Sequence, residues 1–406
     1  MLPLGQVVLR FRAVLYLYWA MSAAFLGYWV VNFEATRQIT AAEIGIMMSL
    51  YTAAALLGQY GWGYLSDRWR SIRLPVVVAS LLFAATVATF PWQTSVRALY
   101  LSMVLVGLLQ QPIGPMIDSW ALKHLGVHGE ENRFGAVRGF GSLGWAMVAL
   151  LTAYLIQHVS WNSMFAVSSI AGLLVALMAA FIPEVGTSTA DPTAGGARVA
   201  GELTTARALR QLFGNRAYVY ILVVVFLMYL GVQTTFNFQG LLIKGTGGGV
   251  AELGWTYFVG VMSEMPAMFL SVWLLPRMPA RRLMILSGCL YMLRYALIIY
   301  FQTPWIILLT ACLEGLAFGL LLTALRSQVF AVVAEEVQTL AMTVVDAVFL
   351  SLTVILGGAV GGWLIEHYSL VHMLAACMAS SALSLALLFL GRRYDRPADS
   401  RTATLP

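Results

Sequence analysis

Six charged side chains stand inside long apolar stretches of the sequence, where an ionised group is costly. Placing such a group at the middle of a membrane helix costs about 2.5–3.5 kcal/mol, so a charge in this position is by default a candidate for function. Two arginines are available as counter-charges to four acids. The six residues are Asp118, Arg138, Glu264, Arg294, Glu314 and Asp346.

The first group of candidates is Asp118, Arg138, Ser142 and Trp145. Ser142 and Trp145 follow Arg138 at i+4 and i+7, so all three share one face of a helix. An arginine offers paired donors to hydroxyl groups, and an indole offers a flat apolar plate to the C–H faces of a polyol. Asp118 would hold the arginine and accept from the same hydroxyls. The pattern predicts a binding site, although the pair could instead only fix helix packing and Trp145 could be a core or interfacial aromatic.

The second group of candidates is Glu264, Arg294 and Glu314, with Asp346 as a further acid. Burial favours the neutral form of a carboxyl group, and a neighbouring arginine favours the ionised form. A motion that moves the carboxyl group past the arginine would change its protonation at the same time as the side of the membrane to which the site opens. We therefore expect Glu264 or Glu314 to carry a proton. Asp346 is the third choice or a partner of Arg294, and each acid could also be permanently paired.

Four other aromatic residues could line a cavity or belong to the aromatic belt at the membrane interface. The belt is the more frequent role, and we expect it here. The four are Trp19, Tyr28, Trp29 and Trp120.

The elements that position all these residues must be membrane helices. Of the 406 residues, 60% are hydrophobic and 10% are charged, and the mean hydropathy is +0.81. Soluble domains carry about 25% charged residues, so the composition excludes a soluble enzyme, a nucleic-acid binder and a disordered scaffold. Three cysteines inside apolar runs are too few for a disulfide framework. The chain is predicted to be an all-α integral membrane protein.

Twelve apolar stretches are long enough to cross the bilayer as helices. With the N-terminus in the cytoplasm, nineteen of the 24 Lys and Arg residues fall on the cytoplasmic side, three outside and two within helices. This asymmetry follows the positive-inside rule and predicts that both termini are cytoplasmic. The predicted helices are 12–33, 43–65, 74–92, 98–122, 136–156, 163–182, 217–242, 252–275, 283–301, 304–328, 340–365 and 371–390.

One long polar stretch divides the chain near its middle. Residues 184–214 are rich in Ala, Gly, Thr and Arg, which predicts a flexible cytoplasmic linker. The linker would join an N-terminal six-helix bundle, residues 1–183, to a C-terminal bundle with a short cytoplasmic tail, residues 215–406.

The two halves resemble each other at an offset of 209 residues. Residues 154–165 match residues 363–374 at five of twelve positions, and the same offset superposes Arg68 on Arg277. Two matches at one offset indicate a duplication. Parallel six-helix repeats related by an axis along the membrane normal are an architecture of secondary transporters, with the substrate site between the halves.

The stretch from Gly63 to Arg73 contains a glycine, three residues, Asp67-Arg68 and then further basic residues. It resembles the loop 2–3 signature of the major facilitator superfamily, although the usual glycine before the last basic residues is absent. The resemblance implies twelve transmembrane helices in two pseudo-symmetric six-helix bundles. It also implies that Asp67 and Arg68 gate the cytoplasmic side by holding the halves together. The alternative is a charged loop that only sets topology.

Within that superfamily, residues 115–118 and 134–145 resemble the oligosaccharide:proton symporter branch, which includes lactose permease. The resemblance implies that an acid, an arginine and a stacking tryptophan bind sugar, and these roles fall on Asp118, Arg138 and Trp145. Related branches for nucleosides or small aromatic acids share much of this pattern, so the identity of the substrate does not transfer.

The C-terminal half follows the same branch only in part. The acid at Glu264 and the arginine at Arg294 again resemble lactose permease. In that protein helix 10 carries a histidine and, one turn later, the proton-carrying glutamate. Here Glu314 stands at the histidine-like position, Ala317 stands where the glutamate would be, and Asn237 lies near a helix-7 aspartate of the family. The proton relay is therefore altered.

These features predict a proton-coupled symporter of the bacterial cytoplasmic (inner) membrane that imports a small hydroxyl-rich solute, such as a sugar or nucleoside, by alternating access. The alternatives are uptake of an aromatic carboxylate and a drug or metabolite:proton antiporter. The sequence shows no nucleophile–base set, metal-ligand spacing or nucleotide-binding loop, so we expect no enzyme activity, no metal and no cofactor, with the proton gradient as the energy source. The expected partners are a small-molecule substrate, protons and lipid, without nucleic acid, and the expected state is a monomer.

Overall fold

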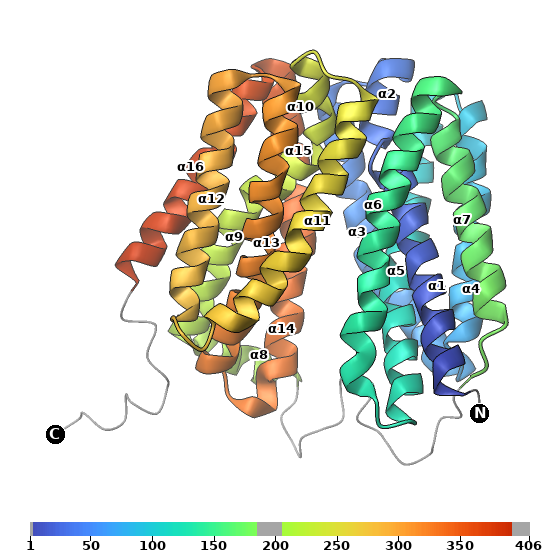
Figure 1. Cartoon of the computed structure of the whole chain (residues 1–406), viewed down its shortest axis with the longest axis horizontal. Helices are drawn as coiled ribbons and strands as arrows, with labels where there is room; N and C mark the ends of the chain where they lie inside the picture. Colours follow the sequence, from blue (N-terminus) through green and yellow to red (C-terminus); the bar gives the residue numbers. More distant parts are fainter. Residues whose placement is uncertain (1–2, 185–204, 392–406) are drawn as a thin grey trace.

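The computed structural model describes residues 3–184 and 205–391, and these residues form helices and no strand. The helices fall into two groups that lie side by side in Figure 1. The first group is coloured blue to green. It contains α1 (Leu4–Leu26), α2 (Trp29–Arg37), α3 (Ala41–Trp69), α4 (Arg73–Thr89), α5 (Val96–Gly126), α6 (Phe134–His158) and α7 (Ser163–Ala180).

The second group is coloured yellow-green to red in the same view. It contains α8 (Thr205–Gly214), α9 (Arg216–Asn237), α10 (Gln239–Gly245), α11 (Val250–Leu274), α12 (Ala280–Phe301), α13 (Pro304–Val332), α14 (Gln338–Ala347), α15 (Thr353–His367) and α16 (Leu370–Leu390).

The predicted membrane architecture is confirmed. Eleven stretches of the described residues are long and apolar enough to cross a membrane. The 25-residue helix α11 stands where the remaining span was predicted, between α10 and α12. Each of the twelve predicted helices therefore has a counterpart in the structure.

Three of the predicted spans are not single α-helices. The chain turns at Gly27 between α1 and α2 and at Phe238 between α9 and α10, and Val348–Leu352 form a π-helical segment between α14 and α15. Apolar residues continue through all three places, so hydropathy gives no sign of the interruptions. Breaks and π-turns inside membrane helices occur frequently at functional sites.

The end of the predicted flexible linker is helical instead. Its last ten residues form α8, which lies at the lower end of the second group in Figure 1 and packs against α9 and α14. Ala208 and Leu212, four residues apart, are buried on one face, while Arg207 and Arg210 are exposed. This amphipathic spacing explains the docking. Residues 185–204 of the linker lie outside the described residues.

The two groups meet at the upper end of Figure 1, where α3 packs on α15 and α6 packs on α11. Gly45 of α3 lies so close to Gly358 of α15 that a Cβ atom at 45 would overlap the carbonyl of 358. On the other side, a Cβ atom at Gly254 of α11 would lie 2.7 Å from the Cβ atom of Ala153 of α6. Small residues permit this close approach of backbones. These two helix contacts are called the upper seal below.

Polar contacts join the rim of the upper seal. Lys244 of α10 forms an ion pair with Glu34 of α2. Glu366, near the end of α15, accepts a hydrogen bond from the backbone N–H of Ala42 over 2.9 Å. Each bond runs between the two groups of helices, so the upper end is closed by polar as well as by backbone contacts.

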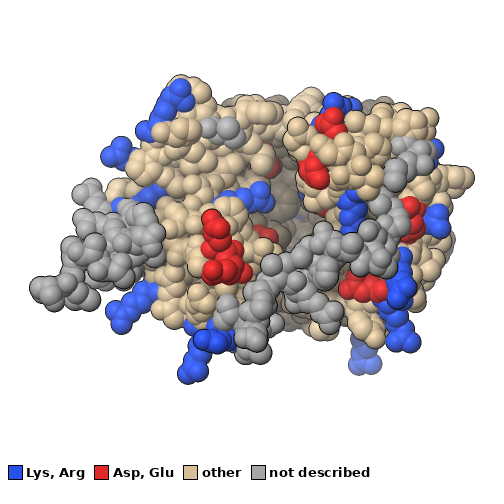
Figure 2. Space-filling model, turned by 90° about the horizontal axis from the view of Figure 1, so that it is seen from below, with Lys and Arg blue, Asp and Glu red and all other residues tan. Residues whose placement is uncertain are grey.

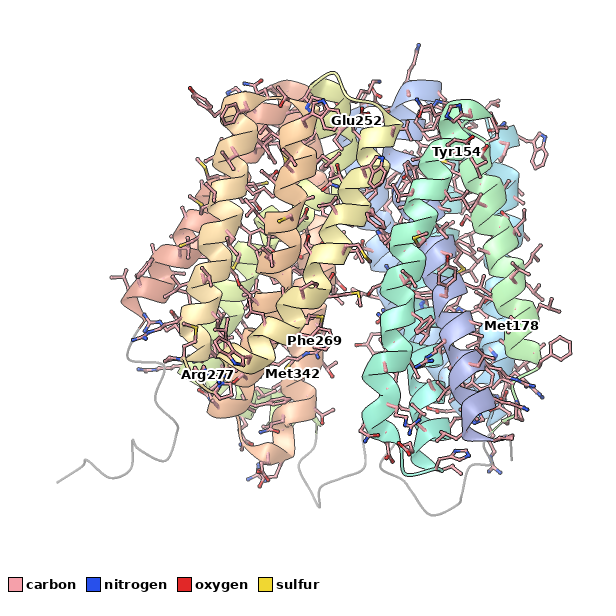
Figure 3. All side chains as sticks on the ribbon, viewed as in Figure 1. Tyr154, Met178, Glu252, Phe269, Arg277 and Met342 are labelled. Atoms are coloured by element: carbon pink, nitrogen blue, oxygen red, sulfur yellow. The ribbon has the colours of Figure 1, made fainter. Side chains whose placement is uncertain are left out.

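Below the upper seal the two groups diverge. Figure 3 places Tyr154 on α6 and Glu252 on α11 at the upper end, and Phe269 on the lower part of α11. The Phe269 side chain is exposed. Viewed from below, Figure 2 shows a hollow between the two groups, with acidic and basic side chains around it. The molecule is therefore closed at one end and open at the other.

The sequence repeat falls at equivalent places in the two groups. Residues 154–165 contain the turn between α6 and α7, and residues 363–374 contain the turn between α15 and α16. Arg68 is near the end of α3, and Arg277 follows the end of α11. The offset of 209 residues thus relates matching helix–turn–helix pairs.

The expected aromatic belt is wrong for the four residues assigned to it. Tyr28, Trp29 and Trp120 are buried, and Trp19 is partly buried against neighbouring helices. Trp120 packs edge-on against Phe11, with ring centroids 5.5 Å apart. These rings fill space between helices, and only the packing reveals which face of each helix they occupy.

Candidate functional site

Arg138 of α6 and Asp118 of α5 form the ion pair expected from the sequence. The Arg138 Nε donates to Asp118 Oδ2 over 3.2 Å, and the two side chains are 33% and 30% exposed. Asp118 Oδ1 is buried and has no hydrogen-bond partner among the described residues. The pair is thus partly open, and Asp118 keeps one unpaired oxygen, which is buried in this conformation.

Trp19 of α1 covers the guanidinium of this pair. The Arg138 Cζ lies 4.7 Å from the Trp19 ring centroid, within the range of a cation–π contact. Gly141 makes room for the indole, because a Cβ atom there would collide with the ring. The Trp19 ring also meets Trp145 nearly edge-on, with centroids 5.9 Å apart. Trp19 was expected in the aromatic belt, with cavity lining as the alternative, and its contact with Arg138 agrees with the alternative.

Trp145 lies where the two groups of helices meet. Its ring is nearly perpendicular to that of Tyr257 of α11, with centroids 6.1 Å apart, and lies 6.4 Å from that of Phe236 of α9. Ser142 lies between Arg138 and Trp145 on α6 and is partly buried. The predicted apolar plate is therefore largely buried, in contact with aromatic rings from both groups of helices.

A polar network that the sequence analysis did not assign lies beside this site. The Tyr51 hydroxyl donates to Gln110 Oε1, and Gln110 Nε2 donates to Ser22 Oγ over 2.6 Å. Ser22 in turn donates to the carbonyl of Tyr18 over 2.9 Å. Gln110 is a buried amide in the middle of a membrane helix, and that property was its signal in the sequence. The network fixes α1, α3 and α5 around the Arg138–Asp118 pair.

Arg294 of α12 and Glu314 of α13 form a second, more deeply buried pair. The Arg294 Nη1 lies 2.8 Å from Glu314 Oε2, and the side chains are 1% and 13% exposed. Arg294 Nη2 donates to Gln239 Oε1 of α10 over 3.2 Å. The sequence analysis placed Arg294 and Glu314 in one constellation, and the structure brings them together.

Glu264 of α11 connects the two pairs. It lies near enough to Arg138 and to Glu314 for both charges to act on it electrostatically. Because Arg138 belongs to the first group of helices, this interaction crosses between the groups. The two predicted groups of charged residues, one around Arg138 and one around Arg294, therefore lie within electrostatic range of each other.

Asp346 is not a partner of Arg294, and that expectation is wrong. The side chain is exposed on α14, and the charge that acts on it is Arg326 of α13. The partner of Arg294 is Glu314. A π-helical segment begins at Val348, two residues after Asp346, and interrupts the predicted span 340–365. Regular helical spacing along that span therefore does not predict which neighbours Asp346 faces.

Asp67 and Arg68 are exposed at the lower end of α3. Arg68 Nη1 lies 3.4 Å from the Tyr64 hydroxyl, and within residues 3–184 and 205–391 neither charge forms an ion pair. Arg70 ends α3 with φ 49°, a left-handed conformation that glycine adopts most readily. The turn after Asp67 therefore keeps a glycine-type backbone without a glycine.

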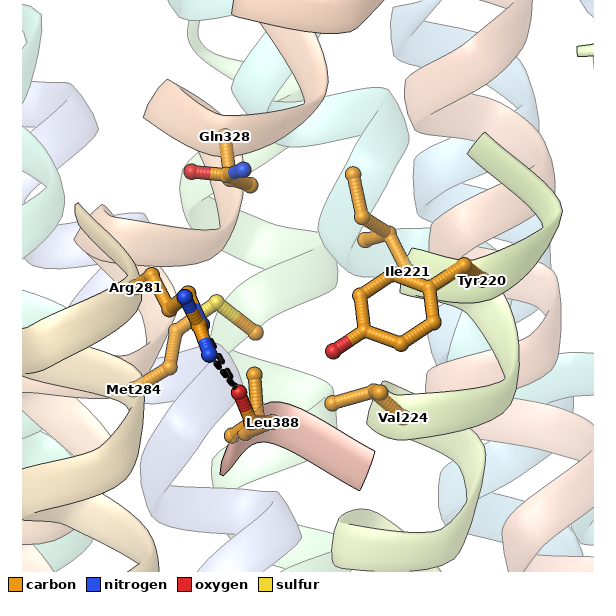
Figure 4. Close-up of a pocket in the computed structure, with 7 residues that line it drawn as sticks. All are labelled: Tyr220, Ile221, Val224, Arg281, Met284, Gln328 and Leu388. Atoms are coloured by element: carbon orange, nitrogen blue, oxygen red, sulfur yellow. Dashed lines mark hydrogen bonds between the residues drawn. The ribbon is translucent and has the colours of Figure 1, made fainter. Parts of the chain in front are cut away.

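A small pocket in the second group, drawn in Figure 4, is not a solute site. Its volume is about 10 Å³, room for about one water molecule. Arg281 donates to the carbonyl of Leu388 over 2.8 Å beside it, near the end of α16. This cation at a helix C-terminus has a structural role.

Known proteins resemble the chain over almost its whole length. Maltose permease of Geobacillus stearothermophilus is 27% identical over 371 residues, which cover 91% of this chain and 90% of that protein. The structure of the nucleoside transporter NupG has a TM-score of 0.80 at 18% identity and covers 96% of this chain and 98% of that one. The D-xylose-proton symporter has a TM-score of 0.73 at 12% identity and covers 94% and 97%.

The family match agrees with the fold and with the resemblance seen in the sequence. Residues 8–376 match the family described as the MFS_1 like family. The match covers most of the chain, and the structures that superpose on it have the same fold. The chain therefore belongs to the MFS_1 like family and is a multi-pass membrane transporter of the major facilitator superfamily.

Proposed function

We propose that this transporter is a proton-coupled symporter that imports a small hydroxyl-rich solute, a sugar or a nucleoside. The observation that carries the proposal is the partly exposed Arg138–Asp118 pair flanked by the indoles of Trp19 and Trp145. Support comes from a maltose permease among its relatives and from nucleoside and D-xylose transporters that share its fold.

Each part of the site has a role in binding such a solute. Arg138 donates to solute hydroxyls, and the free Oδ1 of Asp118 accepts from them. The indole of Trp145 stacks on a C–H face of the ring, and Ser142 supplies a further hydroxyl on the same face of α6. Trp19 orients the arginine through its cation–π contact.

Proton coupling is assigned to Glu264, Glu314 and Asp346, with Arg294 as the cation that holds Glu314. Glu264 is the acid that reaches both constellations electrostatically. When Glu264 binds a proton, one of the two acids that attract Arg138 becomes neutral, while the ion pair of Arg138 with Asp118 remains, so the arginine is held less strongly when the solute arrives. This step would link protonation to binding.

The motion is alternating access between two bodies, residues 1–183 and residues 215–406, joined by the linker 184–214. With both termini in the cytoplasm of a bacterium and the chain in its inner membrane, the hollow seen from below opens inward. Asp67 and Arg68 are exposed in this arrangement and would contact the other body when the lower end closes. The transporter works as a monomer and needs no cofactor besides the proton gradient.

Ligand-induced thermal stabilisation of the purified protein tests the binding site. Maltose, D-xylose, uridine and benzoate are compared, and we expect one of the hydroxyl-rich compounds to raise the melting temperature. Arg138→Ala should abolish that rise, while the exposed Arg133→Ala should retain it. Stabilisation by benzoate alone would refute the solute class and favour aromatic carboxylate uptake, which the ring cluster and arginine could also serve.

Uptake into proteoliposomes with an imposed pH gradient tests the coupling. We expect Glu314→Gln or Glu264→Gln to abolish accumulation against a gradient but to leave exchange of labelled for unlabelled solute. Glu130→Gln, on a partly exposed carboxylate that pairs with Arg133 between α5 and α6, is the control. Unchanged pH-driven accumulation by both core variants would refute their role as proton carriers.

A further inference from the structure

Tyr257 of α11 touches both the candidate site and the upper seal. Its buried ring packs against Trp145 and lies 5.8 Å from the ring of Phe236. Its hydroxyl donates over 3.0 Å to the carbonyl of Gly27. One side chain of the second group therefore contacts the first group at two places, at Trp145 of the site and at the turn after α1.

The acceptor of this bond exists because the first span is broken. Helix α1 ends at Leu26, and Gly27 lies in the turn before α2 begins at Trp29. Carbonyl groups at a helix end lack their regular partner and need another donor. Gly27 also admits the ring, because a Cβ atom at this position would lie 3.2 Å from Tyr257 Cε2.

The location of this bond distinguishes it from the other contacts across the upper end. The ion pair of Lys244 with Glu34 lies at the rim, where its side chains are partly exposed and water competes with it. The bond of Tyr257 is buried, where a hydrogen bond is stronger and an unpaired group is costly. Opening the upper end must break it.

We infer that Tyr257 is a positioning residue that couples occupancy of the site to the upper seal: its hydroxyl holds the seal closed, and its ring transmits contact between solute and Trp145. The first part rests on the hydrogen bond between Tyr257 and Gly27. The second part rests on the proposed function, since it requires a solute in contact with Trp145.

Two matched variants test the first part. Tyr257→Phe removes the hydroxyl that crosses between the groups. Tyr218→Phe removes an equally buried hydroxyl that donates over 2.8 Å to the carbonyl of Ala341 inside the second group, away from the upper seal. Each variant keeps its ring and loses one hydrogen bond, so any difference between them reports the crossing.

Spin labels measure the separation at the upper end. Cysteines are placed at Val159 and Tyr300, which are 71% and 80% exposed near the ends of α6 and α12, in protein whose native cysteines are replaced. Distances come from pulsed electron paramagnetic resonance without ligand. Tyr257→Phe should raise the ratio of open to closed populations about 2- to 10-fold, as expected for one buried hydrogen bond. Tyr218→Phe should leave the ratio unchanged, and equal effects of the two variants would overturn the inference.

The same labels with saturating maltose or uridine test the second part. We expect the ligand to shift the distance distribution of the native chain and to shift that of Tyr257→Phe less. Equal ligand shifts in both proteins would overturn the coupling. A third outcome is that Tyr257→Phe opens the upper end while neither compound shifts the distances of the native chain. That result supports the role of the hydroxyl in the upper seal and counts against the proposed solute class.

Discussion

The buried pair of Arg294 and Glu314 makes a quantitative prediction. Glu314→Gln leaves a guanidinium that is 1% exposed without a counter-charge, with only amide oxygens, of Gln239 and of the new side chain, as acceptors. Removing one partner of a buried pair costs about 3–5 kcal/mol of the free energy of unfolding. The remaining hydrogen bonds to amide oxygens place the cost of this variant near about 3 kcal/mol, the low value of that range. Arg294→Gln should cost less, about 1–3 kcal/mol, because Glu314 can bind a proton and become neutral. The double variant leaves no buried charge, so it should cost about 2–3 kcal/mol less than the sum.

Unfolding of the four purified proteins by SDS in detergent micelles, followed by circular dichroism, measures these free energies. Arg133 and Glu130 supply the control cycle, because that pair is 55% and 29% exposed and should couple by less than about 0.5 kcal/mol. Single-variant costs that add within about 0.5 kcal/mol at the buried pair would refute the idea that the two charges act as one unit.

Two further predictions concern the first site and the upper seal. Trp19→Ala removes the cation–π contact with Arg138 and should weaken solute binding about 2- to 30-fold, whereas Trp19→Phe should retain part of the contact. Titration calorimetry measures the affinities, and equal affinity of Trp19→Ala and the native protein would contradict the role of the indole. Gly45→Leu places a side chain against Gly358 and should separate the upper ends of the two groups. Gly61→Leu on the same helix meets open space and should leave the separation unchanged. Distances between spin labels at Val159 and Tyr300 measure the separation.

Much of the architecture could be predicted because a membrane restricts the alternatives. Long apolar stretches must be helices, and the basic residues between them indicate which connections share a side. The pair of Asp118 with Arg138 followed from the same restriction, since a charge in an apolar helix needs a partner, whereas the partner of Arg294 stayed open among several acids. Scarcity of charge reduced the candidate partners of each arginine to a few acids.

The remaining errors share a physical origin. Tertiary packing determines where the helices break at Gly27 and Phe238 and where the π-helical segment follows Asp346. A hydropathy profile does not detect these interruptions, because apolar residues continue through them. The role of Trp19 depends on which helices are neighbours, because an aromatic residue on a membrane helix is equally compatible with lipid, core or cavity. A single sequence contains no information on that choice until the packing partner of α1 is known.

The two glycine contacts of the upper seal are one contact made twice. Adding 209 to the residue numbers converts Gly45 into Gly254 and Ala153 into Gly362, and a Cβ atom at Gly45 would lie 3.3 Å from the Cα atom of Gly362. Position i of each half therefore faces position j of the other, which is the pattern of an isologous interface in a two-fold dimer. The transporter carries a homodimer-like interface within one polypeptide, and either half, expressed without its partner, would present a surface complementary to a second copy of itself.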